Sequence, residues 1–397
     1  MARISLLSLP LAAPARGAAL RGSNLGERLL PWLLPLALFA LWWLASRNHW
    51  MSEQILPPPS LVWSSAVELA GGELWSHLAI SLQRLFWGLL AGIGAGAVLG
   101  ALLGFSARAE RLVFPTFGAL AQVPTLAWIP LFMVFFGIGE PLKLVVLVKA
   151  IVVPVTLHTL VGVRDAQPNL REAARVLRLP THLLIRRLIL PAALPAFMAG
   201  VRLALAAGWT SLLAVELLAS SEGIGYLMVW ARQLFMLDIV FVCIVVIGVV
   251  GVAMDRGIGW LDRAWVHWPH PATAQIRRGP RYHGWQRLQP GLLPLLLLAL
   301  WQVAAVQGWV DANILASPWA VLLTTAHGVL DGSLSGALGK SLARMLGGLL
   351  LGAGLGFALG LWLGLSRRSE QLLGPTLAAL RQIAIFAWVP LLTAWFG

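Results

Sequence analysis

Charged residues are scarce in this sequence: Asp, Glu, Lys and Arg make up 11% of its 397 residues, whereas hydrophobic residues make up 59%. Too few polar side chains remain to cover a water-facing surface, while the surface of a helix in lipid needs none. Several apolar runs reach the roughly 20 residues that cross a bilayer as a helix. The composition therefore predicts an all-α, polytopic membrane protein and excludes an ordinary soluble domain.

Cysteine is nearly absent too, because Cys243 is the only one, and an internal disulfide is excluded. Gly336–Ser341 (GALGKS) lacks the glycine that opens a phosphate-binding loop. Three histidines are spaced too loosely for a metal site and lack cysteine or acidic partners, namely His267, His270 and His283. With no nucleophile elbow or carboxylate pair either, we expect no catalytic residue, no metal ligand and no cofactor in this chain.

Positive charge dominates, with a net charge of +13, and it alternates along the chain. Four Arg precede the first apolar run, six lie between Arg164 and Arg187, and six more lie between Arg256 and Arg287. The segments between these clusters carry about one each. This positive-inside bias predicts a cytoplasmic N-terminus, with residues 1–28 as a cytoplasmic tail, and lipid rather than nucleic acid as the partner of the basic charge.

Two parts of the chain repeat each other. Leu33–Trp42 (LLPLALFALW) matches Leu292–Trp301 (LLPLLLLALW), and one inserted residue later the match extends to polar, glycine and aromatic positions. Examples of these pairs are Ser81 and Ser341, Arg84 and Arg344, Gly92 and Gly352, Gln122 and Gln382, Trp128 and Trp388, and Pro130 and Pro390. Chance similarity between Leu-rich helices would not keep such residues in register, so the pattern indicates an internal duplication.

The duplication predicts the domain organisation. The first copy offers six spans, at about residues 30–46, 82–104, 115–136, 142–162, 192–218 and 239–255. The second offers three, at about residues 291–306, 342–364 and 375–397. Six crossings return the chain to the cytoplasmic side, so the repeat is parallel. The expected domains are a first membrane domain at 29–255, a basic cytoplasmic linker at 256–289 and half of a second membrane domain at 290–397.

The second copy is expected to be truncated after about three spans. FAWVPLLTAWFG, Phe386–Gly397, repeats the third span of the first copy, which then continues for roughly 130 residues. We expect the sequence to be a fragment of a longer product of roughly 530 residues, or the product of a truncated gene.

The segment at about residues 164–191 lies between the fourth and fifth spans, on the predicted cytoplasmic side. Glu172–Val176 (EAARV) predicts the start of a short helix, because an acidic residue in the first turn suits the helix dipole. Its two alanines give a flat face for docking against another protein. Pro180 is expected to end this helix, and an amphipathic stretch then leads to Leu190-Pro191.

This segment resembles the EAA motif of ABC-importer permeases, E-A-A-x-x-x-G followed by I-x-L-P. Arg178 stands where the motif has glycine, and Leu188 takes the place of isoleucine. LPPPSLVW, VPTLAWIPLFMVFFGIGEP and AVELLASSEGIGYLMVWARQ resemble the nitrate/sulfonate/taurine branch of this family. The residues that the resemblance assigns to coupling with an ATPase are Glu172, Ala173, Ala174, Arg175, Arg178, Leu188, Leu190 and Pro191.

The resemblance implies a tandem, parallel repeat of a six-span permease domain in the bacterial cytoplasmic (inner) membrane. It implies a transport subunit of an ATP-driven importer, which passes a small solute such as nitrate, a sulfonate or taurine from a periplasmic binding protein into the cytoplasm by alternating access. The chain itself would be no enzyme, because ATP and Mg would be bound by partner ATPase subunits. A full-length fused chain would need no separate permease partner.

Two alternatives stay open. One is a secondary transporter or channel that works without ATP, although acidic mid-span residues are nearly absent and the repeat is parallel. The other is a truncated permease fragment without transport activity.

Four polar residues fall inside the predicted spans. Lys149 lies near the middle of its span, where a charge indicates a translocation path or a partner helix. Arg84 and Arg344 lie near the outer ends of theirs, which is typical of a structural ion pair or a headgroup contact. Glu216 is a candidate partner of Arg84 or Lys149.

Overall fold

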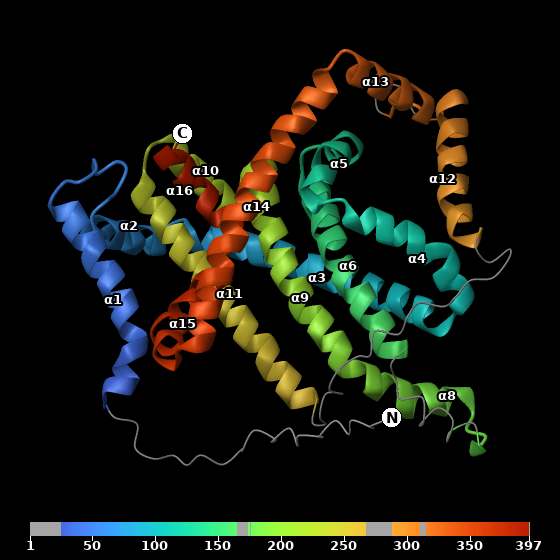
Figure 1. Ribbon diagram of the computed structural model, residues 1–397, viewed down its shortest axis with the longest axis horizontal. Helices are drawn as coiled ribbons and strands as arrows, with labels where there is room; N and C mark the ends of the chain where they lie inside the picture. The colour runs from blue at the N-terminus through green and yellow to red at the C-terminus, as the bar shows by residue number, and fades with distance from the viewer. Residues whose placement is uncertain (1–24, 165–173, 175, 267–287, 310–314, 397) are drawn as a thin grey trace, which may run out of the picture.

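The computed structural model describes residues 25–164, 174, 176–266, 288–309 and 315–396, and these ranges contain helices and turns but no strand. Figure 1 shows the helices at steep angles to one another. In chain order the elements are α1 (Leu25–Arg47), α2 (Pro59–Gly71), α3 (Leu74–Phe105), α4 (Ala107–Gln122), η1 (Thr125–Trp128), α5 (Ile129–Phe136), α6 (Glu140–Arg164), α8 (Thr181–Leu184), η2 (Ile185–Ile189), α9 (Leu190–Ala219), α10 (Ile224–Gln233), α11 (Leu237–Trp265), α12 (Gln289–Val306), α13 (Pro318–Leu330), α14 (Ser333–Leu365), α15 (Arg367–Gln382), η4 (Ile385–Trp388) and α16 (Val389–Phe396).

Seven of the described helices are long and apolar enough to cross a membrane, which confirms the polytopic helical class. They are α1, α3, α6, the run from α8 to α9, α11, α12 and α14. Two further segments are bent pairs: α4 meets η1–α5 at 94°, and α15 meets η4–α16 at 90°. The third predicted span of each copy is therefore a bent pair of helices.

A proline accompanies the first bend, although the matching bend before η4 has the same backbone angles at Ile383 with Ala384 in place of the proline. Pro124 follows Val123, and a residue before proline is pushed out of the helical region by the proline ring. Val123 is accordingly extended, with φ −72° and ψ 120°. The sixth predicted span also differs, because α11 continues to Trp265 and thus makes the first ten residues of the expected linker helical.

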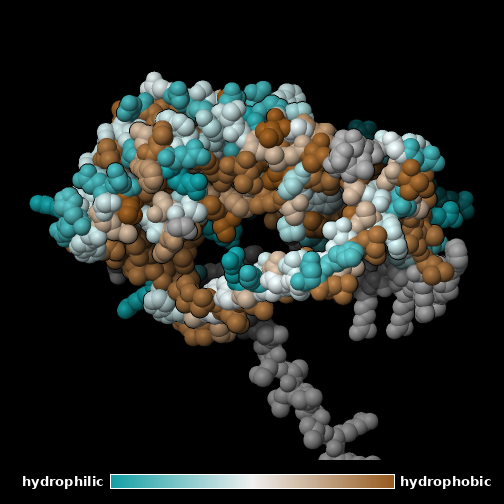
Figure 2. Space-filling view, turned by 90° about the horizontal axis from the view of Figure 1, so that it is seen from above, coloured by the Kyte–Doolittle hydropathy of each residue, from teal (hydrophilic) through white to brown (hydrophobic). Residues whose placement is uncertain are grey.

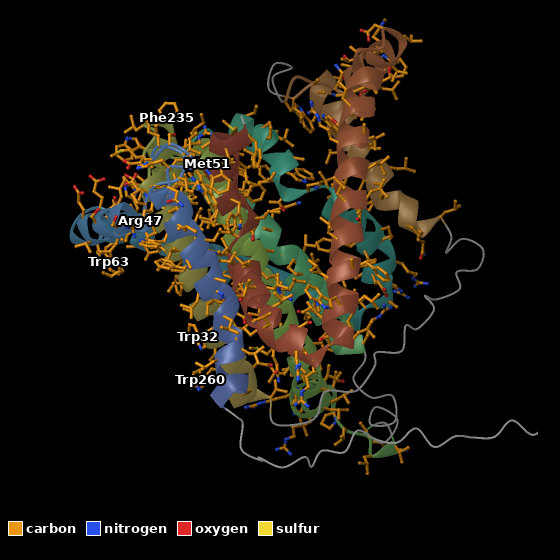
Figure 3. The ribbon with its side chains drawn as sticks, turned by 60° about the vertical axis from the view of Figure 1, so that its left-hand side comes forward. Trp32, Arg47, Met51, Trp63, Phe235 and Trp260 are labelled. Atoms are coloured by element: carbon orange, nitrogen blue, oxygen red, sulfur yellow. The ribbon has the colours of Figure 1, made fainter. Side chains whose placement is uncertain are left out.

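The surface is that of a protein in lipid. Seen from above, hydrophobic residues cover much of the visible surface around an opening through the molecule (Figure 2). Exposed aromatic side chains lie toward both ends of the bundle, Trp32 and Trp260 at one end and Trp63 and Phe235 at the other (Figure 3). Tryptophan is enriched at both membrane–water interfaces, so the two groups mark the edges of a membrane layer.

The core is a packed unit of α3, α6 and α9, hereafter the α3–α6–α9 unit. Glycines on α3 recur every fourth residue and face branched side chains of α6. A Cβ atom added at Gly92 would lie 2.6 Å from Cγ2 of Ile151, and one at Gly96 would lie 2.8 Å from Cβ of Val155. On α9, Gly200 and Gly208 approach α6 as closely. Small residues at this spacing let helix backbones approach in a membrane, where no hydrophobic effect drives association.

The helices from α12 to α16 follow the same order as those from α1 to α5, and their lengths are similar. Ser106 and Ser366 cap α4 and α15 in the same way, each accepting a hydrogen bond from the backbone N–H three residues later. The packing differs, however. α14 has no buried residue, and its glycines at 348, 352, 356, 360 and 364 have open space where a side chain would start.

The bent pair at the C-terminal end packs against helices α1, α10 and α11. α15 contacts α1 and α11, and α16 contacts α10 and α11 (Figure 1). Trp395 Nε1 donates a hydrogen bond to the carbonyl oxygen of Ile55 at 2.9 Å, and Arg232 Nη1 donates to Thr393 Oγ1 at 2.9 Å. These contacts join the second set of helices, α12 to α16, to the first set, α1 to α11.

The glycine packing predicts opposite effects at two matched positions. Gly100→Ala would place a Cβ 2.6 Å from the carbonyl oxygen of Thr156, and we expect this overpacking to destabilise the protein by about 1–3 kcal/mol. Gly360→Ala is the control, because it meets open space and alanine favours a helix by about 1 kcal/mol over glycine. Thermal denaturation in detergent should show a lower midpoint for the first variant only. Equal midpoints would contradict the close contact.

Candidate functional site

The segment from residue 174 to residue 191, hereafter the 174–191 segment, holds most of the described part of the EAA-like motif. Ala174, Arg178, Leu188, Leu190 and Pro191 are described there. Three other predicted coupling residues lie outside the described residues, namely Glu172, Ala173 and Arg175. The linker histidines lie outside them as well, namely His267, His270 and His283.

Arg178 ends the helical turn that contains Ala174. Its φ is +48°, in the left-handed region, and Leu179 N donates to the carbonyl oxygen of Ala174 at 3.0 Å. This is the geometry of a Schellman C-cap, whose left-handed residue is usually glycine. Arg178 thus occupies the position that the motif gives to glycine and adopts the backbone conformation that glycine allows.

Pro180 has a different role from the one expected. The expectation that it ends the helix was wrong, since the helix has already ended at Arg178, two residues earlier. Pro180 instead precedes α8 in an extended conformation, with φ −64° and ψ 146°, and its carbonyl oxygen accepts from the N–H groups of Leu183 and Leu184.

From α8 onward the segment is continuous with a membrane span. α8, η2 and α9 form one helical run of 39 residues, Thr181–Ala219. The one irregular turn is η2, a π-helical turn, in which the N–H of Leu190 reaches the carbonyl oxygen of Ile185. Pro191 has no N–H and its ring crowds the preceding turn, which accounts for a widened turn at this point. The Leu-Pro pair therefore sets how α8 leaves α9.

The 174–191 segment exposes apolar side chains. Val176 is 83% exposed and Leu177 71% exposed, and Leu179 and Leu190 are exposed as well. By contrast, Ala174 is buried, and Ile189 is buried in a small cluster with Val163 and Ala193. One face of the segment is thus held against the spans, while another presents apolar residues outward.

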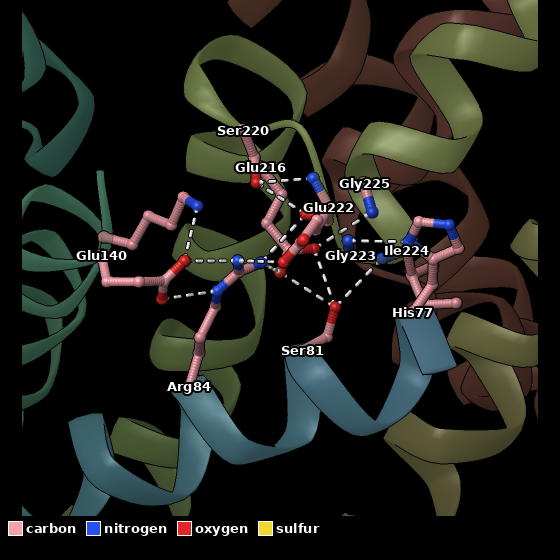
Figure 4. A network of polar contacts seen from close by, with 11 residues as sticks. His77, Ser81, Arg84, Glu140, Glu216, Ser220, Glu222, Gly223, Ile224 and Gly225 are labelled. Atoms are coloured by element: carbon pink, nitrogen blue, oxygen red, sulfur yellow. Dashed lines mark hydrogen bonds and ion pairs between the residues drawn. The ribbon is translucent and has the colours of Figure 1, made fainter. Parts of the chain in front are cut away.

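A second polar site lies at the opposite end of the α3–α6–α9 unit. This Arg84 cluster consists of Ser81, Arg84, Glu140, Glu216 and Glu222 (Figure 4). Arg84 Nη1 donates to Glu216 Oε1 at 2.9 Å. The Glu216 side chain is fully buried, and its carboxylate also lies 2.9 Å from Ser81 Oγ. Of the two candidate partners of Glu216, the structure pairs it with Arg84 and not with Lys149.

The other face of the Arg84 guanidinium binds Glu140 on α6. Arg84 Nε donates to Glu140 Oε2 at 2.9 Å and Nη2 donates to Oε1 at 2.5 Å. Lys143 Nζ donates to the same carboxylate at 2.8 Å. One guanidinium therefore joins α3 to α6 and to α9, and its fork geometry suits two carboxylates at once.

The cluster also holds the turn between α9 and α10. Arg84 Nη1 donates to the carbonyl oxygen of Glu222 at 2.9 Å, and the N–H of Gly225 donates to Glu216 Oε2 at 3.1 Å. Between them, the N–H of Ile224 donates to Ser81 Oγ at 3.0 Å. Gly223 has a φ of +106°, and a Cβ there would collide with the Glu216 carboxylate, so glycine is required.

Arg344 repeats Arg84 in sequence but not in its contacts. It lies on the exposed helix α14, and it forms no ion pair or hydrogen bond within the described part of the chain. Among the described residues, no carboxylate pairs with Arg344 as Glu216 pairs with Arg84.

Lys149 supports the backbone at the first bend. Its Nζ donates to the carbonyl oxygen of Val123 at 2.7 Å and to Thr125 Oγ1 at 3.3 Å, and it lies 5.7 Å from the centre of the Trp128 ring. At the bend the carbonyl oxygen of Val123 has no helical N–H partner, and it accepts a hydrogen bond from the Lys149 ammonium group instead. These contacts hold the bend between α4 and η1.

Sequence reasoning missed several of these polar residues. Glu140 was overlooked because it begins its span. Arg202 and Asp255, on α9 and α11, form an ion pair with oxygen–nitrogen distances of 2.8 and 2.9 Å. Opposite charges inside two apolar runs were the available signal, but 53 residues separate them along the chain. Their contact depends on the register of two helices, which the sequence pattern does not supply.

Comparison with known protein families matches one continuous stretch of the chain, which begins within α3 and ends just after α11. The profile of the family described as "Binding-protein-dependent transport system inner membrane component" matches residues 88–267. This match includes the 174–191 segment, Glu140, Glu216 and Glu222, and it begins four residues after Arg84.

Three relatives illustrate the likeness. The chain is 39% identical over 242 residues to a protein of Escherichia coli (strain K12) assigned as an aliphatic sulfonates transport permease, covering 61% of this chain and 92% of the relative. It is 31% identical to the taurine transport system permease protein of the same organism, covering 63% of this chain and 98% of the relative. It is 31% identical to the bicarbonate transport system permease protein of Synechococcus elongatus, covering 49% and 70%.

The Arg84 cluster predicts a large effect on stability. Arg84→Ala leaves the buried Glu216 carboxylate without its cation, and breaking a buried pair from one side costs about 3–5 kcal/mol. The control is Arg344→Ala, whose change should stay within about 0.5 kcal/mol because the side chain is exposed. Thermal denaturation of both variants in detergent measures the difference. Similar midpoints would show that the cluster does not hold the three helices.

The left-handed conformation of Arg178 predicts a stabilising substitution. Arg178→Gly should slow amide hydrogen exchange in Leu179–Leu184, because a non-glycine residue in this region costs about 1 kcal/mol or more. Arg187→Gly is the matched control, since Arg187 lies within η2, where glycine should speed exchange by lowering helix stability about 1 kcal/mol. Faster exchange in both variants would contradict the capping geometry.

Proposed function

Because the chain belongs to the family of binding-protein-dependent transport system inner membrane components, we propose that it is the permease subunit of an ATP-driven importer of a small anion. Its relatives are transport permeases, so it is a transport subunit and not an enzyme in its own right. ATP and Mg are bound by partner ATPase subunits, and a periplasmic binding protein delivers the solute.

The observation that carries the proposal is the exposed apolar surface of the 174–191 segment at the end of a continuous helix. Val176, Leu177, Leu179 and Leu190 are exposed beside the buried Ala174. Apolar side chains gathered on a turn outside the spans favour a protein partner. The ATPase is that partner, and Glu172, Ala173 and Arg175 precede the exposed residues directly in sequence.

The mechanism follows from how this segment is attached. A displacement at α8 passes along the 39-residue run into α9, since only the π-helical turn interrupts it. α9 cannot slide freely against α6, because Gly200 and Gly208 leave no space between them. The α3–α6–α9 unit therefore moves as a body, and closure of the ATP-bound ATPase dimer switches it between inward- and outward-open arrangements.

The orientation rests on charge. The N-terminus and the 174–191 segment are cytoplasmic, and the Arg84 cluster faces the periplasm. The Arg clusters of the sequence support this orientation, because positive residues are retained on the cytoplasmic side. The protein resides in the bacterial cytoplasmic membrane.

The substrate is a small anion of the sulfonate, taurine, nitrate or bicarbonate type. Support comes from the printed roles of the relatives, which transport aliphatic sulfonates, taurine and bicarbonate. Most of the selection among these anions falls to the binding protein.

We further propose that the chain fuses two permease domains. The shared order of α1–α5 and α12–α16, their similar lengths and the two bends near 90° support a duplicated domain. Within a complete pair, the second domain replaces a separate permease partner. Residues 1–397 carry one segment with the EAA-like pattern, so a polypeptide of these residues offers one ATPase docking site.

An ATP-independent transporter finds less support. Such a protein would couple ions through titratable carboxylates inside its spans. The two carboxylates of the Arg84 cluster that lie in spans, Glu140 and Glu216, are both bound by Arg84. They act as structural ties between helices.

The proposal predicts that Glu172→Lys uncouples the permease from its ATPase. Reversing a charge on the docking face should lower ATPase stimulation and transport by about tenfold, which corresponds to about 1.4 kcal/mol of lost contact energy. Membrane insertion should stay at the wild-type level. Pull-down of the ATPase by the purified permease measures the contact without any binding protein, with one ATPase expected per chain.

Glu53→Lys is the matched control, because it makes the same charge change on an exposed residue between α1 and α2. It should retain ATPase in the pull-down. Wild-type binding by the Glu172→Lys variant would remove the ATPase contact from this segment, and two ATPases per chain would contradict the single docking site.

A further inference from the structure

A cavity lies where the two sets of helices meet. It has a volume of about 460 Å³ and is bounded by α9 and α11 on one side and by α15 and η4 on the other. Pockets of this size hold small organic ligands. Arg202 enters it from α9, twelve residues after the start of that helix, or about 18 Å along its axis. Asp255 borders the cavity from α11, five residues or about 8 Å along the axis from Trp260, so this end of the cavity lies near the edge of the membrane layer that Trp32 and Trp260 mark.

The charges around the cavity do not cancel. Its charged lining residues are Arg202, Asp255 and Arg381. Arg202 Nε and Nη2 donate to the two Asp255 oxygens at 2.8 and 2.9 Å, so this pair is neutral as a unit. Arg381 forms no hydrogen bond or ion pair with any described residue. Arg381 is exposed, so one uncompensated positive charge lies at the open side of the cavity, where a ligand can reach it.

A second donor in the lining also lacks an acceptor. Trp209 on α9 is 3% exposed, and its Nε1 is buried without a hydrogen-bond partner among the described residues. That atom has almost no accessible surface, so the unpaired N–H lies behind the cavity wall and is not open to the cavity. Gln382 adds a side-chain amide beside Arg381. The rest of the wall is largely apolar, including Leu205, Met254 and Ile383.

From these contacts we infer that the cavity binds a small oxyanion. Arg381 supplies the charge and a planar fork of N–H donors that suits carboxylate or sulfonate oxygens, and Gln382 places a side-chain amide beside it. The residue that matches Arg381 in the first set is Ala121, so the charge belongs to this junction alone and suits a monoanion. The inference deepens the proposed transport function, and it names the residues that meet the solute.

Equilibrium dialysis of radiolabelled methanesulfonate against the purified chain in phosphatidylcholine nanodiscs tests this site. Wild type should bind the probe and should not bind choline, a cation of similar size. Arg381→Ala should weaken binding by at least about tenfold, according to the usual strength of a charged hydrogen bond. Arg368→Ala is the matched control, because Arg368 lies on α15 but outside the cavity, and its affinity should equal wild type.

The same oxygen chemistry could come from a lipid headgroup phosphate. Nanodiscs of phosphatidylglycerol distinguish the two sources, since a site for a free oxyanion should give the same methanesulfonate affinity in both lipids. Loss of methanesulfonate binding in phosphatidylglycerol would assign the cavity to lipid and overturn the inference. It would also be overturned if wild type failed to bind the probe, or if Arg381→Ala bound it equally well.

The two proposals fail separately. Dialysis uses neither ATPase nor binding protein, so its outcome does not depend on ATPase coupling. Arg381-dependent binding together with full ATPase retention by Glu172→Lys would refute the docking segment alone. Loss of coupling in Glu172→Lys together with Arg381-independent binding would refute the anion site alone.

Discussion

The close contact between the glycine face of α3 and the branched face of α6 is the constraint on which the rest of the structure depends. No Cβ fits at Gly92, Gly96 or Gly100, so the two helix axes approach as near as backbones allow. That approach brings Arg84 within hydrogen-bond distance of Glu140 on α6 and of Glu216 on α9.

The ion pairs alone could not assemble the helices, because charges buried in lipid are stable only where geometry is already good. Packing therefore comes first, and the cluster then fixes the outer ends and the turn before α10.

This unit links two distant sites. At one end, the run Thr181–Ala219 carries the 174–191 segment with its exposed apolar residues, and at the other the Arg84 cluster holds the α9–α10 turn. The second set of helices lacks these ties: α14 has the same glycine spacing and an arginine in the same register, yet both face open space. Where the second set does contact the first, through α15 and α16, the contact leaves an open cavity bordered by the exposed guanidinium of Arg381. Tight packing thus forms the α3–α6–α9 unit that we propose to move as a body, and looser packing leaves the cavity that we propose as the solute site.

Much of this could be predicted from the sequence, and the failures have physical causes. The helical membrane class followed from composition, and the glycine and Arg84 positions were marked by their recurrence at Gly352 and Arg344. The bend before η1 was missed because hydrophobicity does not report backbone angles, and the matching bend before η4 forms without a proline. Pro180 was misassigned because the chain ends the helix at Arg178, by a left-handed residue that no side-chain pattern announces. Lys149 seemed to need a carboxylate, but its partner is a backbone carbonyl, which every residue possesses. Arg202 and Asp255 meet only through the register of two helices.

The central claim is that ATP hydrolysis in a partner moves a small anion through these helices. Uptake of radiolabelled methanesulfonate into proteoliposomes, with the permease, its partner ATPase and the binding protein all present, measures this most directly. The account predicts ATP-dependent accumulation that disappears when the ATPase subunit is replaced by a variant unable to hydrolyse ATP. Uptake that persists with the hydrolysis-deficient ATPase would contradict it.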